Sequence, residues 1–566
     1  MEYGYLYSID SIQAIQNVYI IIKLANKKPA LPYFVRGSAN SSVLCYLLGI
    51  SHIDPIKYGV VLARFLNSTR KDLPDVDIDF PSHLRDEMFR RIQKQFLGRV
   101  ARISNKVCFR ERSSVRQAMR NMLIHRFFGK NEDPFDILSP DVKNKVAYEA
   151  CKLNGKLNYY SLHCGGILIY PEKIPSNIVL KTDKKIKDEI MPQVIYDKYD
   201  VDRLGLFKID ILSNRAFSTL LHIDSRPLCK YPESDHETSK ILSTSVIGIT
   251  LAESSLIGSI CKKYSPKTRY ELALVLSLAR PASSSTRRLK KDDLKMLDSS
   301  DDILIFDDDA IEYISKLTGM SHDLADRYRK YFAKNNKDGK SKFIKILQKR
   351  GYGNSKVKLI VRKLNTLRLY GFCKGHALAF AHLVWGLAYS KAHYPSRFWL
   401  AALNYSNTEW RKWVYYRSAI TEGGLNIDLA HPGKDKWRLK GNRLIKGGRQ
   451  KTLTEYFNKT TDMNYRKAYL EYGYWTDSNF LSDMYLHKME KDGKILVRFI
   501  GLIGRVKYSS IRDYITIGYD NNKYIDCSVR IGEKRTFYDE YDIIDGYGTL
   551  QNNTVIHVTC VDYIKL

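Results

Sequence analysis

The chain of 566 residues lacks the features that mark several large classes of protein. Its nine cysteines form no C-x-x-C pair and are odd in number, so they indicate neither a zinc cluster nor a disulfide framework. Its longest apolar runs, such as residues 18–22 and 272–279, are far shorter than the roughly 18 residues that cross a bilayer. The N-terminus has no signal-peptide pattern. We therefore expect an intracellular protein without a role in the membrane.

Acidic residues are scarce relative to basic ones. Lys and Arg number 92 against 61 Asp and Glu, which gives a formal net charge of +31. The basic residues are spread through the chain, with local runs at residues 85–120, 181–187, 287–291 and 340–362. So large an excess repels itself unless an anion neutralises it, and its distribution suits a long phosphate track. A single basic run is more often a solvated helix face, but the global charge predicts a polyanionic partner.

Hydrophobic periodicity predicts a multidomain α+β protein. With 44% hydrophobic residues, the chain is long enough for roughly three to four domains with their own cores. Residues 83–155 carry apolar residues at helical spacing and lie between two strand-like segments, 75–80 and 206–211. Residues 216–400 are also mostly helical in pattern. From residue 494 onward, short alternating runs separated by Gly, Asn and Asp turns predict a small antiparallel β-barrel.

Three aspartates, Asp75, Asp77 and Asp79, stand at every second position of one strand-like segment. In a strand, alternation places all three carboxylates on one face, with about 7 Å between successive ones. Such crowding is costly without cations, and two Mg²⁺ ions held by carboxylates of neighbouring strands are the usual device for displacement at phosphorus. Asp210, in an otherwise apolar run with Lys208 nearby, is the candidate on the neighbouring strand. An exposed edge strand or a turn explains D-x-D-x-D about equally well, and spacing alone does not choose among the three.

Two further polar motifs each have an ordinary structural explanation. The R-G-S turn at residues 36–38 precedes an apolar, helix-compatible run at residues 43–48. A turn that opens a helix presents unpaired backbone N–H groups, and the adjacent Arg36 adds charge-assisted hydrogen bonds, which together suit a triphosphate. A capping turn is the commoner meaning of R-G-S. The D-D-D cluster at residues 307–309 predicts the solvated start of a helix, because consecutive aspartates point in different directions.

The order of these motifs resembles that of the alpha subunit of bacterial DNA polymerase III, in the C family of replicative polymerases. The similar segments are F-V-R-G-S-A-N-S-S (34–42), L-G-I-S-H-I-D-P-I-K-Y (48–58), A-R-F-L-N (63–67), P-D-V-D-I-D-F (74–80), L-H-C-G-G-I-L-I (162–169), L-G-L-F-K-I-D-I-L (204–212), Y-G-F-C-K-G-H-A-L-A-F-A (370–381) and L-A-Y-S-K-A-H-Y-P-S-R-F (387–398). Several ordered motifs across about 370 residues are much more specific than any one of them.

The resemblance implies a set of catalytic residues. Asp75 and Asp77 would be the paired metal ligands of the palm, and Asp210 would be the third catalytic carboxylate and metal ligand. Asp79 would then be accessory. The implied cofactor is a pair of Mg²⁺ ions, with Mn²⁺ as a substitute.

The resemblance also implies a nucleotide-binding set. Gly37 and Ser38 match the glycine-serine turn at the incoming triphosphate, with Arg36 and Lys208 as its charge partners. Arg280 matches the R-P-G-P element of the fingers, and Lys374 and His376 match the nucleotide-facing fingers loop. The R-P-G-P element has become R-P-A-S here, which changes the local turn. For His163, in a segment that resembles the family's H-A-G-G, a core or capping role is as well supported as a functional one.

The implied fold is a palm of the polymerase-beta-type nucleotidyltransferase class, with a helical thumb and fingers and a C-terminal OB-type β-barrel. The implied domains are the palm at 1–83 and 156–215, the thumb at 84–155, the fingers at 216–400, a connector with a degenerate helix-hairpin-helix region at 401–490 and the OB domain at 491–566. Only about thirty residues precede the R-G-S turn, so we expect the family's PHP domain to be absent. The chain resembles a minimal version of the family, of phage or plasmid type.

The implied function is DNA-templated addition of deoxynucleotides to a primer 3′ end in a bacterial cytoplasm, in replication of a phage or plasmid genome. The partners would be primer-template DNA, dNTPs and, because no D-x-E exonuclease set is apparent, a separate proofreading exonuclease. Residues 450–457 fit the pattern of peptides that dock on a sliding clamp, although a packed stretch of the hairpin region is the favoured explanation. The alternatives are a catalytically silent DNA-binding accessory subunit, a repair or lesion-bypass enzyme, and a template-independent nucleotidyltransferase.

Overall fold

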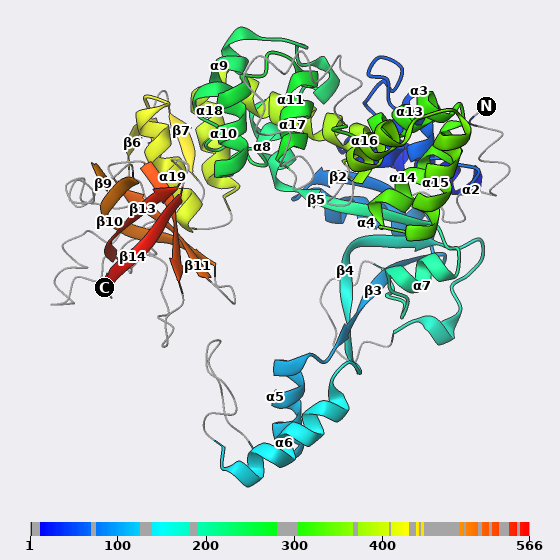
Figure 1. Cartoon of the computed structure of the whole chain (residues 1–566), viewed down its shortest axis with the longest axis horizontal. Coiled ribbons are helices and arrows are strands. Elements are labelled where there is room, and N and C mark those ends of the chain that lie inside the picture. The colour runs from blue at the N-terminus through cyan, green and yellow to red at the C-terminus, as the bar shows by residue number, and fades with distance from the viewer. Residues whose placement is uncertain are drawn as a thin grey trace. The chain divides into compact units, whose positions relative to one another are not determined.

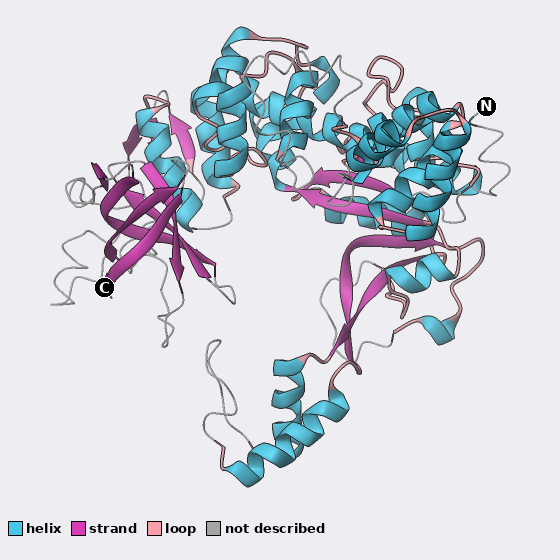
Figure 2. Ribbon diagram, in the orientation of Figure 1, coloured by secondary structure: helices cyan, strands magenta, loops and turns pink. Residues whose placement is uncertain are grey.

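The chain forms a mixed α/β structure of two compact units (Figures 1 and 2). The computed structural model describes residues 2, 12–69, 75–124, 138–180, 191–279, 304–365, 372–406, 409–428, 437–440, 443–445, 486–491, 494–507, 512–519, 523–530, 543–551 and 555–564. Unit 1 comprises residues 1–217, 227–229 and 273–382, and unit 2 comprises residues 218–226, 230–272 and 383–566. In the part of the chain so described, no helix is both long and apolar enough to cross a membrane.

A five-stranded mixed sheet forms the centre of unit 1. Its order is β1 (Phe34–Arg36), β2 (Val76–Pro81), β5 (Lys208–Asn214), β4 (Leu157–Ile169) and β3 (Val100–Cys108). Strands β2 and β5 pair in parallel, whereas β1–β2, β5–β4 and β4–β3 are antiparallel. The two segments predicted as strands around residues 75–80 and 206–211 are therefore adjacent strands.

The two faces of strand β2 differ in chemistry. Val76, Ile78 and Phe80 are buried in one core cluster with helices α2 (Ile12–Asn26) and α4 (Arg85–Gln95). Successive side chains of a strand alternate between the two faces. Because the odd positions therefore point away from this core, the sheet presents its aspartates on the face opposite these helices.

Strands β3 and β4 lead to a small helical pair (Figure 1). Helices α5 (Glu111–Asn121) and α6 (Pro140–Leu153) share an apolar cluster that includes Val115, Met119 and Val146. The prediction of helix throughout residues 83–155 is wrong for residues 100–108, which form β3. The physical reason is that Val100, Ala101 and Ile103 are buried against β4 and the loops beside it.

The other helices of unit 1 are α3 (Val43–Leu47), α7 (Lys198–Arg203), α13 (Asp307–Thr318), α14 (His322–Ala333), α15 (Lys337–Lys349) and α16 (Asn354–Asn365). Helices α13 to α16 share a second core, in which Phe332, Phe343 and Leu347 are fully buried. This core anchors the segment that precedes the Y-G-F-C-K-G-H motif.

Unit 2 is mainly helical before its last third. Its helices are α9 (His236–Thr244), α10 (Ser255–Tyr264), α18 (Pro395–Asn404) and α19 (Glu409–Thr421), and it shares α8 (Arg215–Ile223), α11 (Arg269–Leu278) and α17 (Lys374–His393) with unit 1. A small sheet follows in the order β6 (Asn426–Asp428), β8 (Arg443–Ile445), β7 (Arg438–Lys440). The expectation of a mostly helical pattern over residues 216–400 is confirmed for the described residues.

The C-terminal part of unit 2 is a six-stranded sheet. Its strands are β9 (Leu486–Lys491), β10 (Lys494–Lys507), β11 (Arg512–Tyr519), β12 (Lys523–Arg530), β13 (Ile543–Gln551) and β14 (Val555–Ile564). The order is β11-β12-β14-β13-β10-β9, and β10 also pairs with β11, so five strands form a closed ring of pairings. The expected antiparallel arrangement is wrong for one pair, because β12 and β14 run in parallel.

Candidate active site

Strand register brings the distant aspartates together. Asp77 on β2 lies directly opposite Asp210 on β5, and Arg36 on β1 lies opposite Asp77 on its other side. In-register partners of a parallel pair project from the same face, so both carboxylates enter one space. Asp79 lies two residues further along the same face, and Asp75 is the exposed residue immediately before β2.

Arg36 binds two of these carboxylates. Its Nε donates to Asp79 Oδ1 over 3.1 Å, and its Nη1 lies 3.6 Å from Asp77 Oδ2. The second oxygen of Asp79 accepts a 2.8 Å hydrogen bond from Asn214 Nδ2. Because both of its oxygens are held by protein groups and its side chain is buried, Asp79 orients Arg36. Asn214 was not found from the sequence, since an Asn at a strand end gives no signal of its partner.

Lys208 occupies the other side of the aspartate group. Its Nζ donates to Asp210 Oδ2 over 2.7 Å and lies 3.8 Å from Asp75 Oδ1. The other oxygen of Asp210, Oδ1, is buried and has no hydrogen-bond partner among the described residues. A buried carboxylate oxygen without a partner is costly, and a cation would remove that cost.

His163, on β4, lies beside the partnerless oxygen without donating to it. Its Nδ1 is 3.8 Å from Asp210 Oδ1 but accepts the backbone N–H of Gly166 over 2.7 Å and that of Gly165 over 3.3 Å. A ring nitrogen that accepts hydrogen bonds carries no proton. Burial lowers the pKa of His163, and nearby Lys208 lowers it further against the opposing effect of Asp210. This neutral histidine fixes the Gly165–Gly166 segment of β4 next to the site, which is a structural role.

The ionisation of the site reflects an excess of carboxylates in little water. Burial raises the pKa of Asp77 to about 7; Arg36 opposes this shift, while Asp210 adds to it. Burial also raises the pKa of Asp79. For Lys208, burial lowers the pKa, but the carboxylates of Asp210 and Asp75 outweigh it and the net shift is upward. Two cations therefore do not fully compensate four carboxylates, and the site favours additional positive charge.

The donor set fits a divalent cation in its chemistry. Within the described ranges, no three His, Cys, Asp or Glu side chains are already arranged as a metal site. However, hard divalent cations prefer carboxylate oxygens, and Asp77 and Asp210 face the same space, where one buried oxygen of Asp210 has no hydrogen-bond partner among the described residues. Arg36 and Lys208 are the groups that such a cation would compete with.

The R-G-S turn lies against the aspartates. Gly37 has a φ of 87°, and a Cβ at this position would lie 3.6 Å from Asp77 Oδ2. Ser38 begins a short 3-10 helix, Ser38–Ser41, and is partly exposed. A positive φ favours glycine, so the turn brings its backbone close to the carboxylates without a side chain in the way.

The expected free N–H groups of the following helix are not free. The carboxylate of Glu2 accepts the backbone N–H of Val43 over 2.8 Å and of Leu44 over 2.9 Å, and it also accepts the Ser42 hydroxyl over 2.7 Å. The interpretation of that helix start as an anion site is therefore wrong, because a carboxylate of the same chain already binds there. Only the turn itself remains as a candidate for the triphosphate.

The first turn of α17, where the sequence predicts a loop, packs directly on this turn. Asn40 Nδ2 donates to the carbonyls of Val35 (3.0 Å), Gly37 (3.4 Å) and Gly375 (3.3 Å), and Ser51 Oγ donates to Asn40 Oδ1 over 2.6 Å. A Cβ on Gly375 would lie only 2.9 Å from the Asn40 Cβ. Gly375, which lies between the two residues expected to face the nucleotide, and Gly37 of the turn are thus held together by a buried amide that sequence motifs did not single out.

Lys374 and His376 are fixed next to this contact. The Lys374 backbone N–H donates to Asp308 Oδ2 over 3.0 Å, and its Nζ lies 3.4 Å from the Gly59 carbonyl. The His376 ring lies between Phe372 and Phe380, with centroid distances of 5.2 and 4.6 Å. Arg280 lies outside the described residues.

The D-D-D cluster begins a helix, as predicted, but it is not solvated. Asp307 forms ion pairs with Arg64 over 3.0 Å and with Arg329 over 3.1 Å. Asp308 accepts the backbone N–H of Val61 over 3.0 Å as well as that of Lys374. Both aspartates are almost fully buried. The prediction of solvation is wrong because the cations and N–H groups that satisfy these carboxylates come from distant parts of the chain.

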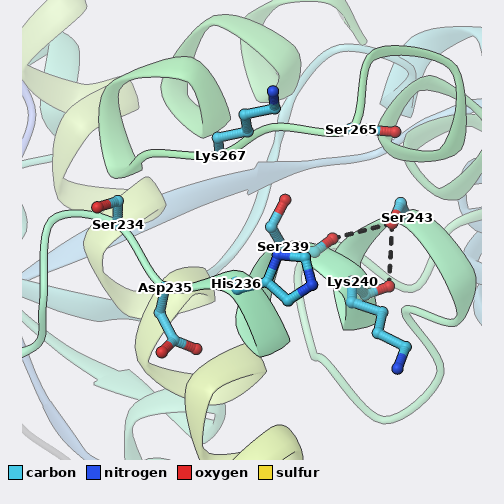
Figure 3. Close-up of a pocket in the computed structure, with 8 residues that line it drawn as sticks. All are labelled: Ser234, Asp235, His236, Ser239, Lys240, Ser243, Ser265 and Lys267. Atoms are coloured by element: carbon cyan, nitrogen blue, oxygen red, sulfur yellow. Dashed lines mark hydrogen bonds between the residues drawn. The ribbon is translucent and has the colours of Figure 1, made fainter.

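A separate cavity of about 580 Å³ lies in unit 2 (Figure 3). It is lined by the start of α9 and the loop after α10, namely Ser234, Asp235, His236, Ser239, Lys240, Ser243, Ser265 and Lys267. None of the site residues predicted from the sequence lines it.

Two family models match the chain. One describes the NTPase domain of bacterial DNA polymerase III alpha and matches residues 12–213, and the other describes the finger domain of the same subunit and matches residues 222–351. The chain belongs to the C family of DNA polymerases, the family of these alpha subunits.

Individual relatives agree with this assignment. The DNA polymerase III subunit alpha of Thermotoga maritima is 26% identical over 439 residues, which cover 74% of this chain and 48% of the relative. That of Halalkalibacterium halodurans is 26% identical over 65% of this chain and 37% of the relative. The error-prone DNA polymerase of Saccharophagus degradans is 26% identical over 71% of this chain and 44% of the relative. The matched region thus spans less than half the length of these relatives.

Proposed function

We propose that this protein is a DNA-templated DNA polymerase that adds deoxynucleotides to a primer 3′ end. The observation that carries the proposal is the register of β2 and β5, which sets Asp77 opposite Asp210 with a buried, partnerless oxygen on Asp210. Membership of the C family supports the same activity. Replication of a phage or plasmid genome in a bacterial cytoplasm is the setting that we propose.

Asp75, Asp77 and Asp210 are the residues that would hold two divalent ions, Mg²⁺ or in its place Mn²⁺. When bound, such ions lower the pKa of a primer hydroxyl and stabilise charge at the reacting phosphate and the leaving group. Asp79 stays with Arg36 and Asn214, because both of its oxygens are already used. Its role is then to position Arg36 rather than to bind metal.

The incoming triphosphate would be held by the turn residues Gly37 and Ser38 and by the side chains of Arg36 and Lys208. Lys374 and His376, in the first turn of α17, would complete the set. Arg36 and Lys208 now bind the carboxylates, so they lie within reach of phosphates placed beside the same aspartates. Charge-assisted hydrogen bonds to phosphate are strong and orient the group. Arg280 is proposed for the same set on its sequence motif alone.

The remaining parts of the chain would bind the DNA. We propose the helical pair α5 and α6 as the tip of the thumb, and the C-terminal sheet as an OB-type barrel. The support for the barrel is its closed ring β10-β11-β12-β14-β13 with one parallel pair, β12–β14. The degenerate hairpin region and the clamp-like residues 450–457 lie outside the described residues. A sliding clamp and a separate proofreading exonuclease stay predictions.

One observation favours a second candidate, a silent DNA-binding accessory subunit. Lys208 and Arg36 neutralise part of the carboxylate charge by ion pairs, as a scaffold without metal would require. The partnerless oxygen of Asp210 argues against it, because a scaffold has no reason to retain that cost.

Primer extension on a longer template tests the proposal. We expect the wild-type chain to extend the primer only with a template and Mg²⁺ or Mn²⁺. Asp210→Asn should abolish extension while binding primer-template DNA nearly as well, whereas the exposed control Asp202→Asn on α7 should extend normally. A wild-type protein that binds the DNA but adds no nucleotide would favour the silent subunit. Wild-type rates in Asp210→Asn would refute the metal assignment, and extension without template would indicate an untemplated transferase.

A further inference from the structure

Helices α15 and α16 carry a dense positive charge that the local structure does not neutralise. Residues 337–365 contain ten Lys and Arg residues against a single acid, Asp338, a net charge of +9. The two helices contact each other and both contact α14, and Figure 1 shows the three together in unit 1. Because α15 and α16 bury Phe343, Leu347 and Ile360 against the core, their charged residues lie on the outer faces.

The cations of α15 form a stripe. At 100° per residue, Lys342, Lys345 and Lys349 fall within an arc of about 60° on the side away from Phe343, and they span about 10 Å along the helix axis. All three are exposed, and none has an ion-pair or hydrogen-bond partner in the described part of the chain. Lys358 and Arg362 form a similar exposed pair, one turn apart, on α16.

This charge is not explained by the stability of the fold. Like charges three or four residues apart on a helix repel each other. Lys349 lies in the last turn of α15, where a cation is favourable, but Lys342 and Lys345 do not. Helix α14 of the same bundle behaves differently, because Asp326 pairs with Arg329 over 2.8 Å and with Lys330 over 3.5 Å. The acid of α14 thus pairs with cations of its own helix, whereas Lys342, Lys345 and Lys349 of α15 are exposed to solvent.

We propose that the outer faces of α15 and α16 bind the phosphodiester backbone of DNA. Regularly spaced lysines with no acid among them suit a line of phosphates, and they carry no groups arranged for base readout. This inference rests on the proposed function for its ligand and adds to it a contact surface, residues 337–365, on other elements than the aspartate site and the parts proposed above to hold DNA. The surface would lengthen the DNA footprint rather than take part in nucleotide addition.

The test is the salt dependence of DNA binding, measured by fluorescence anisotropy without nucleotide. The probes are a labelled blunt duplex, a single strand and a primer-template with a long single-stranded overhang. The test variant is the triple Lys342→Ala, Lys345→Ala, Lys349→Ala, in which alanine preserves helix propensity. The control removes the same charge from exposed lysines on or next to other helices of unit 1, as Lys23→Ala, Lys27→Ala, Lys94→Ala.

We expect the slope of log K against log salt to fall in magnitude by about 2 with the test triple on single-stranded probes, or by nearly 3 on duplex, and by little with the control. The probe that shows the loss identifies the bound part of the DNA. A second triple variant with arginine at the same three positions keeps the positive charge and should give the wild-type slope. An unchanged slope on all probes, or an equal loss in the control, would overturn the proposal. Because no nucleotide is present, this result is independent of whether the chain extends primers.

Discussion

Asp308 holds the first residue of α17, next to the turn proposed to bind the triphosphate, and its replacement by asparagine should weaken nucleotide binding. Its two oxygens accept the backbone N–H groups of Val61 and Lys374, each over 3.0 Å, in an almost fully buried position. Asparagine keeps one acceptor oxygen but places an NH₂ group against the other N–H. One charge-assisted hydrogen bond is lost and one buried donor is left without a partner.

The size of the effect follows from these two terms. Loss of a hydrogen bond to a charged group costs about 1.5–3 kcal/mol. Burial raises the pKa of Asp308, which shows that the protein already disfavours its charge, and this offsets part of the loss. We therefore expect about 2 kcal/mol, which corresponds to roughly a 30-fold change if it is fully expressed in nucleotide binding.

The assay is single-nucleotide primer extension with varied dNTP concentration. We expect KM for the dNTP to rise by up to about 30-fold in Asp308→Asn, with a much smaller change in kcat. The reason is that the start of α17, which Asp308 holds, is proposed to contact the nucleotide and not the reacting groups. The exposed Asp202→Asn on α7 is the matched control and should leave both constants unchanged. If the variant lowers thermal stability but leaves KM unchanged, the reasoning is refuted, and Asp308 serves only the fold.

Gly375→Ala should lower the rate of nucleotide addition, because the new Cβ would lie 2.9 Å from that of Asn40 and would push the start of α17 away from the R-G-S turn. Extension at the wild-type rate would contradict the importance of this contact. Lys391→Met should destabilise unit 2 by about 3 kcal/mol, since the buried ammonium donates to two backbone carbonyls and to Glu422, and an unchanged urea midpoint would disprove this. Burial lowers the pKa of His52 from 6.5 to about 4, so the unfolded chain takes up a proton first as the pH falls. Stability should therefore decrease by up to about 3 kcal/mol between pH 6.5 and 4. His52→Phe should flatten that dependence. If the free energy of unfolding from urea titrations falls equally between pH 6.5 and 4 in both proteins, His52 is not its source.

The sequence was informative where a pattern repeats along the chain. Asp77 and Asp210 each interrupt a short apolar run. The apolar neighbours that made both runs strand-like are buried in one core cluster, and the two strands lie side by side. Alternation then fixes the face on which the carboxylates lie. The adjacency of these segments came from the family resemblance, since no local pattern states which strands pair.

What the sequence could not give was the distant polar partner. Glu2 caps the helix that begins at Val43, and nothing near residue 2 predicts that contact. Asp307 was expected in water because its local sequence is that of an exposed helix start, yet Arg64 and Arg329 bury it. A carboxylate's surroundings depend on side chains brought in by tertiary packing, and these carry no periodic signal.

The charge balance of the site connects the two sides of the proposed reaction. In the described part of the chain, the ion pairs of Asp75, Asp77, Asp79 and Asp210 with lysine or arginine come from Arg36 and Lys208. Four carboxylates thus share the charge of these two cations, and such an excess is the condition for attracting divalent ions. When such ions compensate the aspartates, Arg36 and Lys208 have less to bind, and phosphates placed beside them gain two strong donors. Arg36 and Lys208, which pair with the carboxylates when no metal is bound, would therefore become the side chains that hold the triphosphate.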